Sequence, residues 1–181
     1  MLRVLFLVFL ISLSSEVNAN NKDQIINKLK STSNLNFDFE QNINGKIELG
    51  KCTIQYPKKM FCEYDKKNKV MVSNGKSLVI KSNSSYYRYT LNKTPLNFIL
   101  DKNFLIKRIS KLNEEIINNS LIKYTIKENG QLIDIFFDIK NYELIGWQTK
   151  DIYQNIAVTL LYSIKLNQVV DKKIFTTPLQ N

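Results

Sequence analysis

Apolar and polar side chains alternate along residues 35–43, where every odd position except Gln41 is apolar. A repeat of two places successive side chains on opposite faces of a strand, so this stretch is predicted to be a half-buried β-strand. Similar runs follow at short intervals, and two pairs of them flank Asn74-Gly75 and Asn129-Gly130, a dipeptide that favours tight hairpins. The pattern predicts nine further strands, at residues 46–56, 59–65, 70–73, 77–81, 86–91, 121–128, 132–139, 144–150 and 156–166.

Helical spacing occurs in few places. Residues 23–30 carry Ile25, Ile26 and Leu29 on one face, which predicts a short helix capped by Asn21 or Asp23. Thr94-Pro95 predicts a second helix over residues 95–100, with Thr94 as its cap, and residues 104–112 continue it as a second helical piece.

Because strands that neighbour one another in sequence usually pair, we expect one continuous antiparallel sheet, and about ten strands must curl or close. The concave face of such a sheet is filled by its own large side chains, by a helix or by a ligand. Since the expected helices are short, this pattern leaves room for a ligand.

The first 19 residues resemble a secretory signal. Arg3 precedes a ten-residue apolar stretch, Val4–Leu13, which only Ser12 interrupts, and small residues lead up to Ala19. A spanning helix needs about 20 apolar residues, which favours a cleaved signal over an uncleaved anchor. We expect cleavage after Ala19, a single domain over residues 20–181, and a periplasmic location.

Composition excludes several kinds of chemistry. The 181 residues contain no histidine and two cysteines, so neither Ser-His-Asp nor Cys-His catalysis nor a histidine-liganded metal site is expected. No nucleophile elbow is present either, which makes an esterase the weakest alternative. We therefore expect no catalytic residue, no metal and no cofactor.

The formal net charge of +10 has two interpretations. Asn, Lys and Ile are encoded by A·T-rich codons, so the lysines reflect either base composition or a basic surface that faces acidic lipid headgroups or an acidic partner. Nucleic-acid binding is not expected, because the chain has three arginines and no dense basic run.

Cys52 and Cys62 stand five residues on either side of Pro57. A three-residue loop at residues 56–58 places the two cysteines directly opposite each other, and an oxidising compartment then favours a cross-strand disulfide. A two-residue loop places them on opposite faces, and the alternative is two free thiols.

Alternation in this hairpin and in the preceding strand gives the concave face its side chains. The residues predicted to line the concave face, and with it any ligand cavity, are Phe37, Phe39, Ile54, Tyr56, Met60 and Tyr64, and ordinary core packing is the alternative for each of them.

Several strings resemble the periplasmic outer-membrane lipoprotein carrier (LolA-like) family. These are Phe39-Glu40-Gln41, GKCTIQYPKKMFCEY at residues 50–64, VMVSNGKSLV at residues 70–79, Thr94-Pro95-Leu96, and the closing Phe175 with Pro178. The resemblance implies a mainly β fold with short lid helices, in which the concave residues line a lipid-binding cavity. It is an incomplete, unclosed antiparallel β-barrel of ten or eleven strands that encloses an apolar cavity.

The family resemblance implies a monomeric carrier that shields the acyl chains of lipoproteins. It takes them from an inner-membrane ABC transporter and passes them to an outer-membrane lipoprotein receptor. The lid residues implied are Leu29, Pro95, Phe98, Ile99 and Leu100. The family often has an arginine that hydrogen-bonds the lid backbone where this sequence has Tyr56. The alternative function is another periplasmic lipid-binding or lipoprotein-sensing module of the same fold.

Overall fold

The computed structural model describes residues 20–66, 68–150 and 154–180, and its main element is one antiparallel sheet. The predicted signal peptide lies outside the described residues. Six strands come before the central helices of the chain: β1 (Asn34–Ile43), β2 (Lys46–Gln55), β3 (Lys59–Tyr64), β4 (Val70–Asn74), β5 (Ser77–Lys81) and β6 (Tyr86–Thr90). Five come after them: β7 (Glu115–Ile117), β8 (Leu121–Glu128), β9 (Gln131–Asp138), β10 (Leu144–Lys150) and β11 (Ile156–Leu166).

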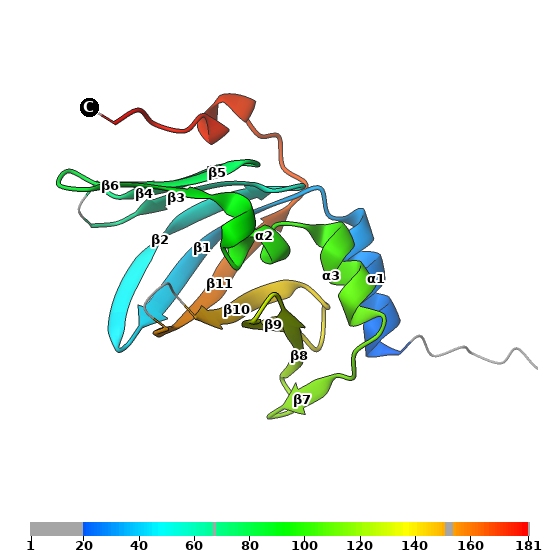
Figure 1. The fold of residues 1–181 in the computed structure, drawn as a ribbon. Coiled ribbons are helices and arrows are strands. Elements are labelled where there is room, and N and C mark those ends of the chain that lie inside the picture. Colours follow the sequence, from blue (N-terminus) through cyan, green and yellow to red (C-terminus); the bar gives the residue numbers. More distant parts are fainter. Residues whose placement is uncertain (1–19, 67, 151–153, 181) are drawn as a thin grey trace, which may run out of the picture.

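The strand order is β6-β5-β4-β3-β2-β1-β11-β10-β9-β8-β7, with β6 and β7 at the two edges. The unclosed antiparallel fold is therefore confirmed. Two meanders are joined in the middle by the pairing of β1 with β11, in which Phe39 lies opposite Leu161. The sheet curls strongly, so that β3–β6 and β8–β10 form its two sides (Figure 1).

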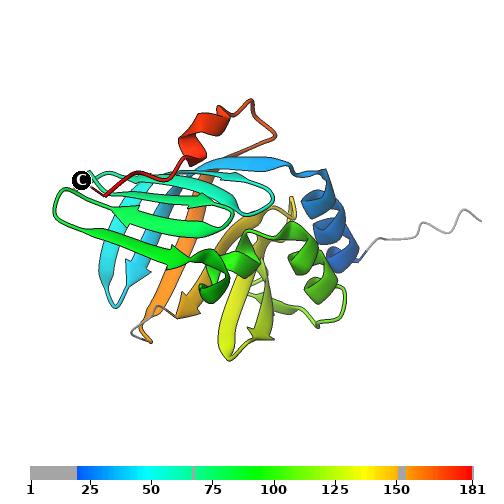
Figure 2. The same ribbon diagram turned by 45° about the horizontal axis from the view of Figure 1, so that its top comes forward.

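Helices occupy the space between those two sides (Figures 1 and 2). They are α1 (Asn21–Ser31), the 3₁₀ turn η1 (Leu91–Lys93), α2 (Leu96–Ile99) and α3 (Lys102–Ile109). We call residues 20–31 and 91–112 the helical layer. A second 3₁₀ turn, η2 (Lys172–Phe175), packs outside the curl against β3 and β4. None of the helices in the described residues is both long and apolar enough to cross a membrane.

Two predicted helix caps were wrong. The N-cap of α1 is Asn20, whose side chain accepts a hydrogen bond from the Asp23 N–H, because the helix starts earlier than its apolar spacing indicated. Thr94 does not cap α2, because its hydroxyl donates to the Leu91 carbonyl in the preceding 3₁₀ turn. Asp101 caps α3 by accepting from the Phe104 N–H, which starts that helix at Lys102.

Candidate functional site

The concave face of the first meander carries all the side chains predicted to line a cavity. Each is buried, with between 0 and 8% of its surface exposed: Phe37, Phe39, Ile54, Tyr56, Met60 and Tyr64. The register of β1, β2 and β3 aligns them in rows, because Phe37 faces Cys52, and Ile54 faces Met60. The structure therefore brings the six together on one face.

One of these rows packs closely because Gly50 has no side chain. Gly50 lies on β2 between Phe39 of β1 and Tyr64 of β3, and the two rings meet across it edge to face, with centroids 5.0 Å apart. A Cβ at Gly50 would lie 2.8 Å from the Phe39 ring and 2.1 Å from the carbonyl oxygen of Glu63. Glycine is required here because ring and backbone fill the space of any side chain.

Cys52 and Cys62 form a disulfide within the β2–β3 hairpin, with their Cα atoms 4.1 Å apart. Gln55 pairs with Lys59, which leaves residues 56–58 as a three-residue loop. The predicted register and the predicted bond are both confirmed. The disulfide lies on the concave face, where Phe37 of β1 pairs directly with Cys52 of β2.

The helical layer fills the space in front of this face. Leu29, Phe98, Ile99 and Leu100 are buried in the same apolar cluster as the sheet residues, whereas Pro95 is half-buried. Ile25, which was predicted only as part of a helix face, is also fully buried, and so are Leu105 and Ile109, which were not predicted to line the interior. Next to α1 remains a hollow of about 10 Å³, lined in part by Leu29, Leu35 and Tyr56. The concave space is therefore packed with apolar side chains from the helices.

The second meander also lines this interior. Its buried members include Ile122, Tyr124, Phe137 and Trp147, and the Trp147 ring meets Phe37 edge to face at 6.5 Å. No cavity residue was predicted in this half of the sheet. The signal was present, because apolar residues occupy alternate positions at 122, 124 and 126 and again at 133, 135 and 137.

Tyr56 stands where the family often has an arginine, and its ring is buried. Its hydroxyl has no hydrogen-bond partner among the described residues. Burial raises the pKa of this phenol above the ordinary value of 10.0, so the group is neutral. The Nζ of Lys102 lies 6.0 Å from the centre of the Tyr56 ring. The phenol therefore does not hydrogen-bond the helical layer.

The hairpin loop contacts the helical layer through Lys58 instead. Its backbone N–H donates to the Leu100 carbonyl at 2.7 Å, and its Nζ lies 3.5 Å from Oδ2 of Asp101. Leu100 is one of the lid residues that the family resemblance implied, and the hairpin loop contacts it through the backbone of Lys58.

A second lysine joins the two longer helices of the layer. Nζ of Lys102, at the start of α3, donates to the carbonyls of Thr32 at 2.7 Å and Lys30 at 3.2 Å. These carbonyls end α1, where the helix has no amide partners for them and where a cation is favoured.

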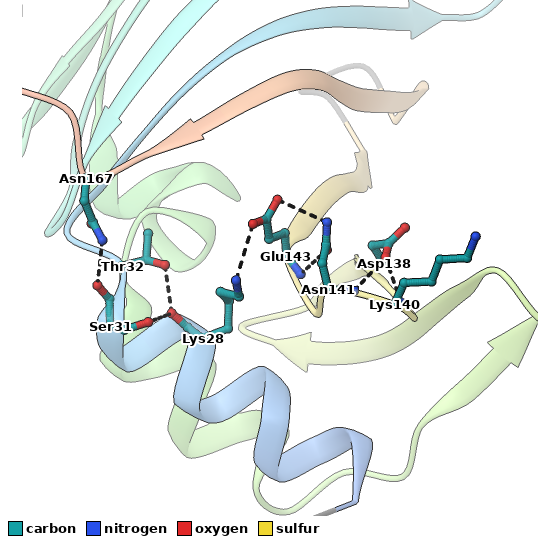
Figure 3. Close-up of polar contacts among 8 residues, drawn as sticks. All are labelled: Lys28, Ser31, Thr32, Asp138, Lys140, Asn141, Glu143 and Asn167. Carbon is teal, nitrogen blue, oxygen red and sulfur yellow. Dashed lines mark hydrogen bonds and ion pairs between the residues drawn. The ribbon is translucent and has the colours of Figure 1, made fainter.

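The end of α1 is also tied to the sheet (Figure 3). Nζ of Lys28 lies 3.4 Å from Oε1 of Glu143 in the β9–β10 turn, and the Asn167 side chain donates to the Ser31 carbonyl at 3.0 Å. On α3, Arg108 forms an ion pair with Glu128 of β8. Polar contacts therefore fasten the rim of the layer, while its inner face is apolar.

A larger hollow, of about 420 Å³, lies on the other face of the sheet. Its lining is mixed, and includes Asp38, Lys51, Glu63, Phe61 and Ile174. It lies beside η2, on the convex face, and shares no lid residue with the concave interior.

A model of the outer membrane lipoprotein carrier protein LolA matches residues 20–178. No curated protein matches the sequence significantly. Among solved structures, an uncharacterized conserved protein from Thermus thermophilus is similar with a TM-score of 0.51 and 7% identity, over 88% of this chain and 95% of that one. A LolA superfamily protein from Nitrosomonas europaea has a TM-score of 0.46 and 10% identity, over 88% of this chain and 99% of that one. With the family model spanning nearly all the described residues, the chain belongs to the LolA family of outer membrane lipoprotein carrier proteins.

Proposed function

We propose that this protein is a periplasmic carrier that shields lipoprotein acyl chains in the interior now filled by its helical layer. One observation carries the proposal: the concave face of an unclosed sheet is covered by apolar side chains from separate short helices, whose polar contacts with the sheet and with each other lie at the rim. Helices held in this way can be displaced while the disulfide-bonded hairpin and the paired strands stay in place.

The energies make this exchange reversible. An acyl chain of about 16 carbons gains on the order of 12 kcal/mol by leaving water. Burial of one Leu, Ile or Phe side chain is worth about 1.5–3 kcal/mol, so exposing four of them costs about 6–12 kcal/mol. The four are the predicted lid residues Leu29, Phe98, Ile99 and Leu100, and a displacement that also exposes Ile25, Leu105 and Ile109 costs about 10–21 kcal/mol. Because these two quantities are similar, cargo enters without being held too firmly to leave.

A carrier of this kind needs a donor and an acceptor. We propose an inner-membrane ABC transporter and an outer-membrane lipoprotein receptor as these partners, in keeping with the family. No chemical step is required of the protein, and its sequence has no histidine to serve as a general base at neutral pH.

A fluorescent fatty acid tests the proposal. We expect one bound probe per protein, displaced by an N-terminally acylated peptide and not by the same peptide without its acyl chain. Mass spectrometry of protein purified without detergent should show an acylated protein. Equal displacement by both peptides would indicate a peptide-binding groove and contradict the carrier function.

A further inference from the structure

Strand β6 leaves one side of the sheet open. It ends the first meander and pairs only with β5, over five consecutive residue pairs without a bulge. Figure 2 shows it as the outermost strand on its side of the sheet. Edge strands are commonly blocked by shortness, lysine, proline or a bulge. The other edge, β7, is only three residues long, whereas β6 has five residues and none of these features.

Hydrogen bonds on either side of β6 fix the pattern of its ladder. Before the strand, the Ser82 N–H donates to the Ser85 carbonyl at 2.8 Å. After it, the Leu91 N–H donates to the Lys76 carbonyl at 2.9 Å. Hydrogen-bonded pairs alternate with pairs that lack hydrogen bonds along an antiparallel ladder, so every second residue between these two points bonds β5.

Tyr87 and Tyr89 are the residues of β6 whose backbone groups bond β5. The N–H and C=O groups of Tyr86, Arg88 and Thr90 point the other way, and no described strand pairs with them. Arg88 and Thr90 are also exposed. The open side of β6 therefore offers backbone donors and acceptors to an extended chain.

The same strand borders the concave interior. Tyr89 lies opposite Leu78, which is part of the apolar cluster beneath the helical layer, and Tyr89 packs against that cluster. Tyr87 stacks on Tyr89 with ring centroids 6.5 Å apart and is 52% exposed. The concave face therefore ends at β6 in one packed and one exposed tyrosine ring, next to the unpaired backbone.

The charge of this part of the chain has one sign. Residues 66–100 contain seven cations and no carboxylate, whereas the rest of the chain contains 19 cations and 16 carboxylates. Lys76 lies across the ladder from Leu91, Lys93 follows in η1, and both are exposed, as is Arg88. None of these three cations forms an ion pair with a described residue. A chain that pairs with β6 therefore meets unpaired positive charge.

Building on the proposed function, we infer that β6 pairs with the extended, acidic peptide segment that follows the acylated residue of a lipoprotein. Acyl chains held in the interior are joined to the N-terminal residue of their peptide, so this peptide leaves across a margin of the concave face. An added strand gains main-chain hydrogen bonds that do not depend on sequence, and side-chain charge then selects among cargoes. A second copy of this chain is a poorer occupant, because two positive edges repel each other.

Thr90→Pro tests the backbone contact. Thr90 has a φ of −73°, which proline also adopts, and its side chain makes no capping hydrogen bond. The change removes an outward N–H and leaves the bonds to β5 in place. It should weaken binding of a fluorescent N-palmitoylated acidic peptide by about 2- to 12-fold, the effect of one hydrogen bond. Thr90→Val keeps the N–H and is the matched control, which should bind this peptide like the unchanged protein.

The peptide supplies a second test. Only every other amide of an added strand faces its neighbour, so N-methylation of one alternate set of peptide amides should weaken binding, while methylation of the other set should not. The amides of Arg88 and Thr90 should exchange more slowly when the acylated acidic peptide is bound, and should be unaffected by the fatty acid alone.

Charge is tested on both partners. Gln in place of each Glu of the peptide should weaken binding and reduce its dependence on salt. In the protein, Lys76→Gln with Lys93→Gln should weaken peptide binding by about 2- to 25-fold, since an exposed ion pair is worth about 1.4- to 5-fold. Lys51→Gln with Lys165→Gln, at exposed lysines beside the convex hollow, is the matched control.

Fatty-acid binding separates this inference from the proposed function. Each of these variants should bind the fatty-acid probe like the unchanged protein, because the changed residues are exposed and lie outside the interior. Equal binding of the acylated peptide by Thr90→Pro and Thr90→Val, with fatty-acid binding intact, would overturn the inference and leave the carrier function. Absence of fatty-acid binding by the unchanged protein would reject both. A dimer in solution that Thr90→Pro dissociates and Thr90→Val does not would assign the edge to a second copy and also overturn the inference.

Discussion

At the level of single side chains, the helical layer is held by groups that do not stand out in the sequence. Tyr56, the position at which the family resemblance implied a contact with the lid, makes no hydrogen bond to the layer through its hydroxyl. Lys58 and Lys102 make the polar contacts instead, one through its backbone and both through their ammonium groups. Neither was predicted, because one lysine among many carries no pattern, and the partners are carbonyls that any residue supplies.

Tyr56→Phe tests whether the phenol contributes anything polar. Because the hydroxyl is buried without a partner, its removal should leave the free energy of unfolding unchanged or raise it by up to about 1–3 kcal/mol. Chemical denaturation measures this. The control is Tyr124→Phe. The Tyr124 hydroxyl donates to Glu114 at 3.1 Å, so its removal should lower the free energy of unfolding. Equal losses in the two variants would mean that Tyr56 has a polar partner after all.

Lys102→Met tests the contact between α3 and α1. Loss of the bonds to the Thr32 and Lys30 carbonyls should lower the free energy of unfolding by about 1.5–3 kcal/mol. Because the closed layer opposes loading, its destabilisation should raise the affinity for the fatty-acid probe. The affinity should rise by up to tenfold for each loss of about 1.4 kcal/mol. Lys107→Met, on the exposed side of the same helix, is the matched control. Unchanged probe affinity in Lys102→Met would show that this contact does not oppose loading.

At the level of elements, alternation located the strands well because one face of each is buried. The predicted ranges at 77–81, 121–128, 144–150 and 156–166 agree with the structure at both ends. The strand β7 was missed, since it is three residues long and Ile116 is exposed. The third helix was placed two residues late because its start depends on capping by Asp101 and not on apolar spacing.

The pairing within the β2–β3 hairpin could be predicted from the spacing of its two cysteines around Pro57. Cys52 and Cys62 enclose a short loop, so the double variant Cys52→Ala, Cys62→Ala should lose about 2–3 kcal/mol of stability. Alkylation of the non-reduced, denatured protein, followed by mass spectrometry, should find no free thiol. Two alkylated cysteines in that experiment would contradict the bond.

At the level of the whole molecule, strand order was the part that the sequence did not reveal. Local pairing explains each meander, but the junction of β1 with β11 is a contact between distant residues that leaves no local pattern. The same is true of the C-terminal segment. Phe175 of η2 is buried outside the curl, where Val72 and Val79 are also buried on the convex face.

Phe175→Ala tests whether this outer cluster is structural. Removal of a buried phenylalanine should lower the free energy of unfolding by about 3–5 kcal/mol, while the folded protein keeps its affinity for the fatty-acid probe. Leu179→Ala, at a side chain that is 81% exposed, should change neither quantity. A weaker probe affinity in Phe175→Ala would mean that the two faces of the sheet are coupled.

The pairing of β1 with β11 also dictates when this chain is able to fold. Leu35 lies opposite Leu166, so the middle of the sheet joins residues from nearly opposite ends of the described chain. During synthesis or translocation the first meander forms early, but β1 keeps a bare edge until residue 166 has emerged. An edge of this kind is a template for pairing with other chains. Any product that ends before β11 should therefore aggregate, and the last strand to appear is the one that protects the first.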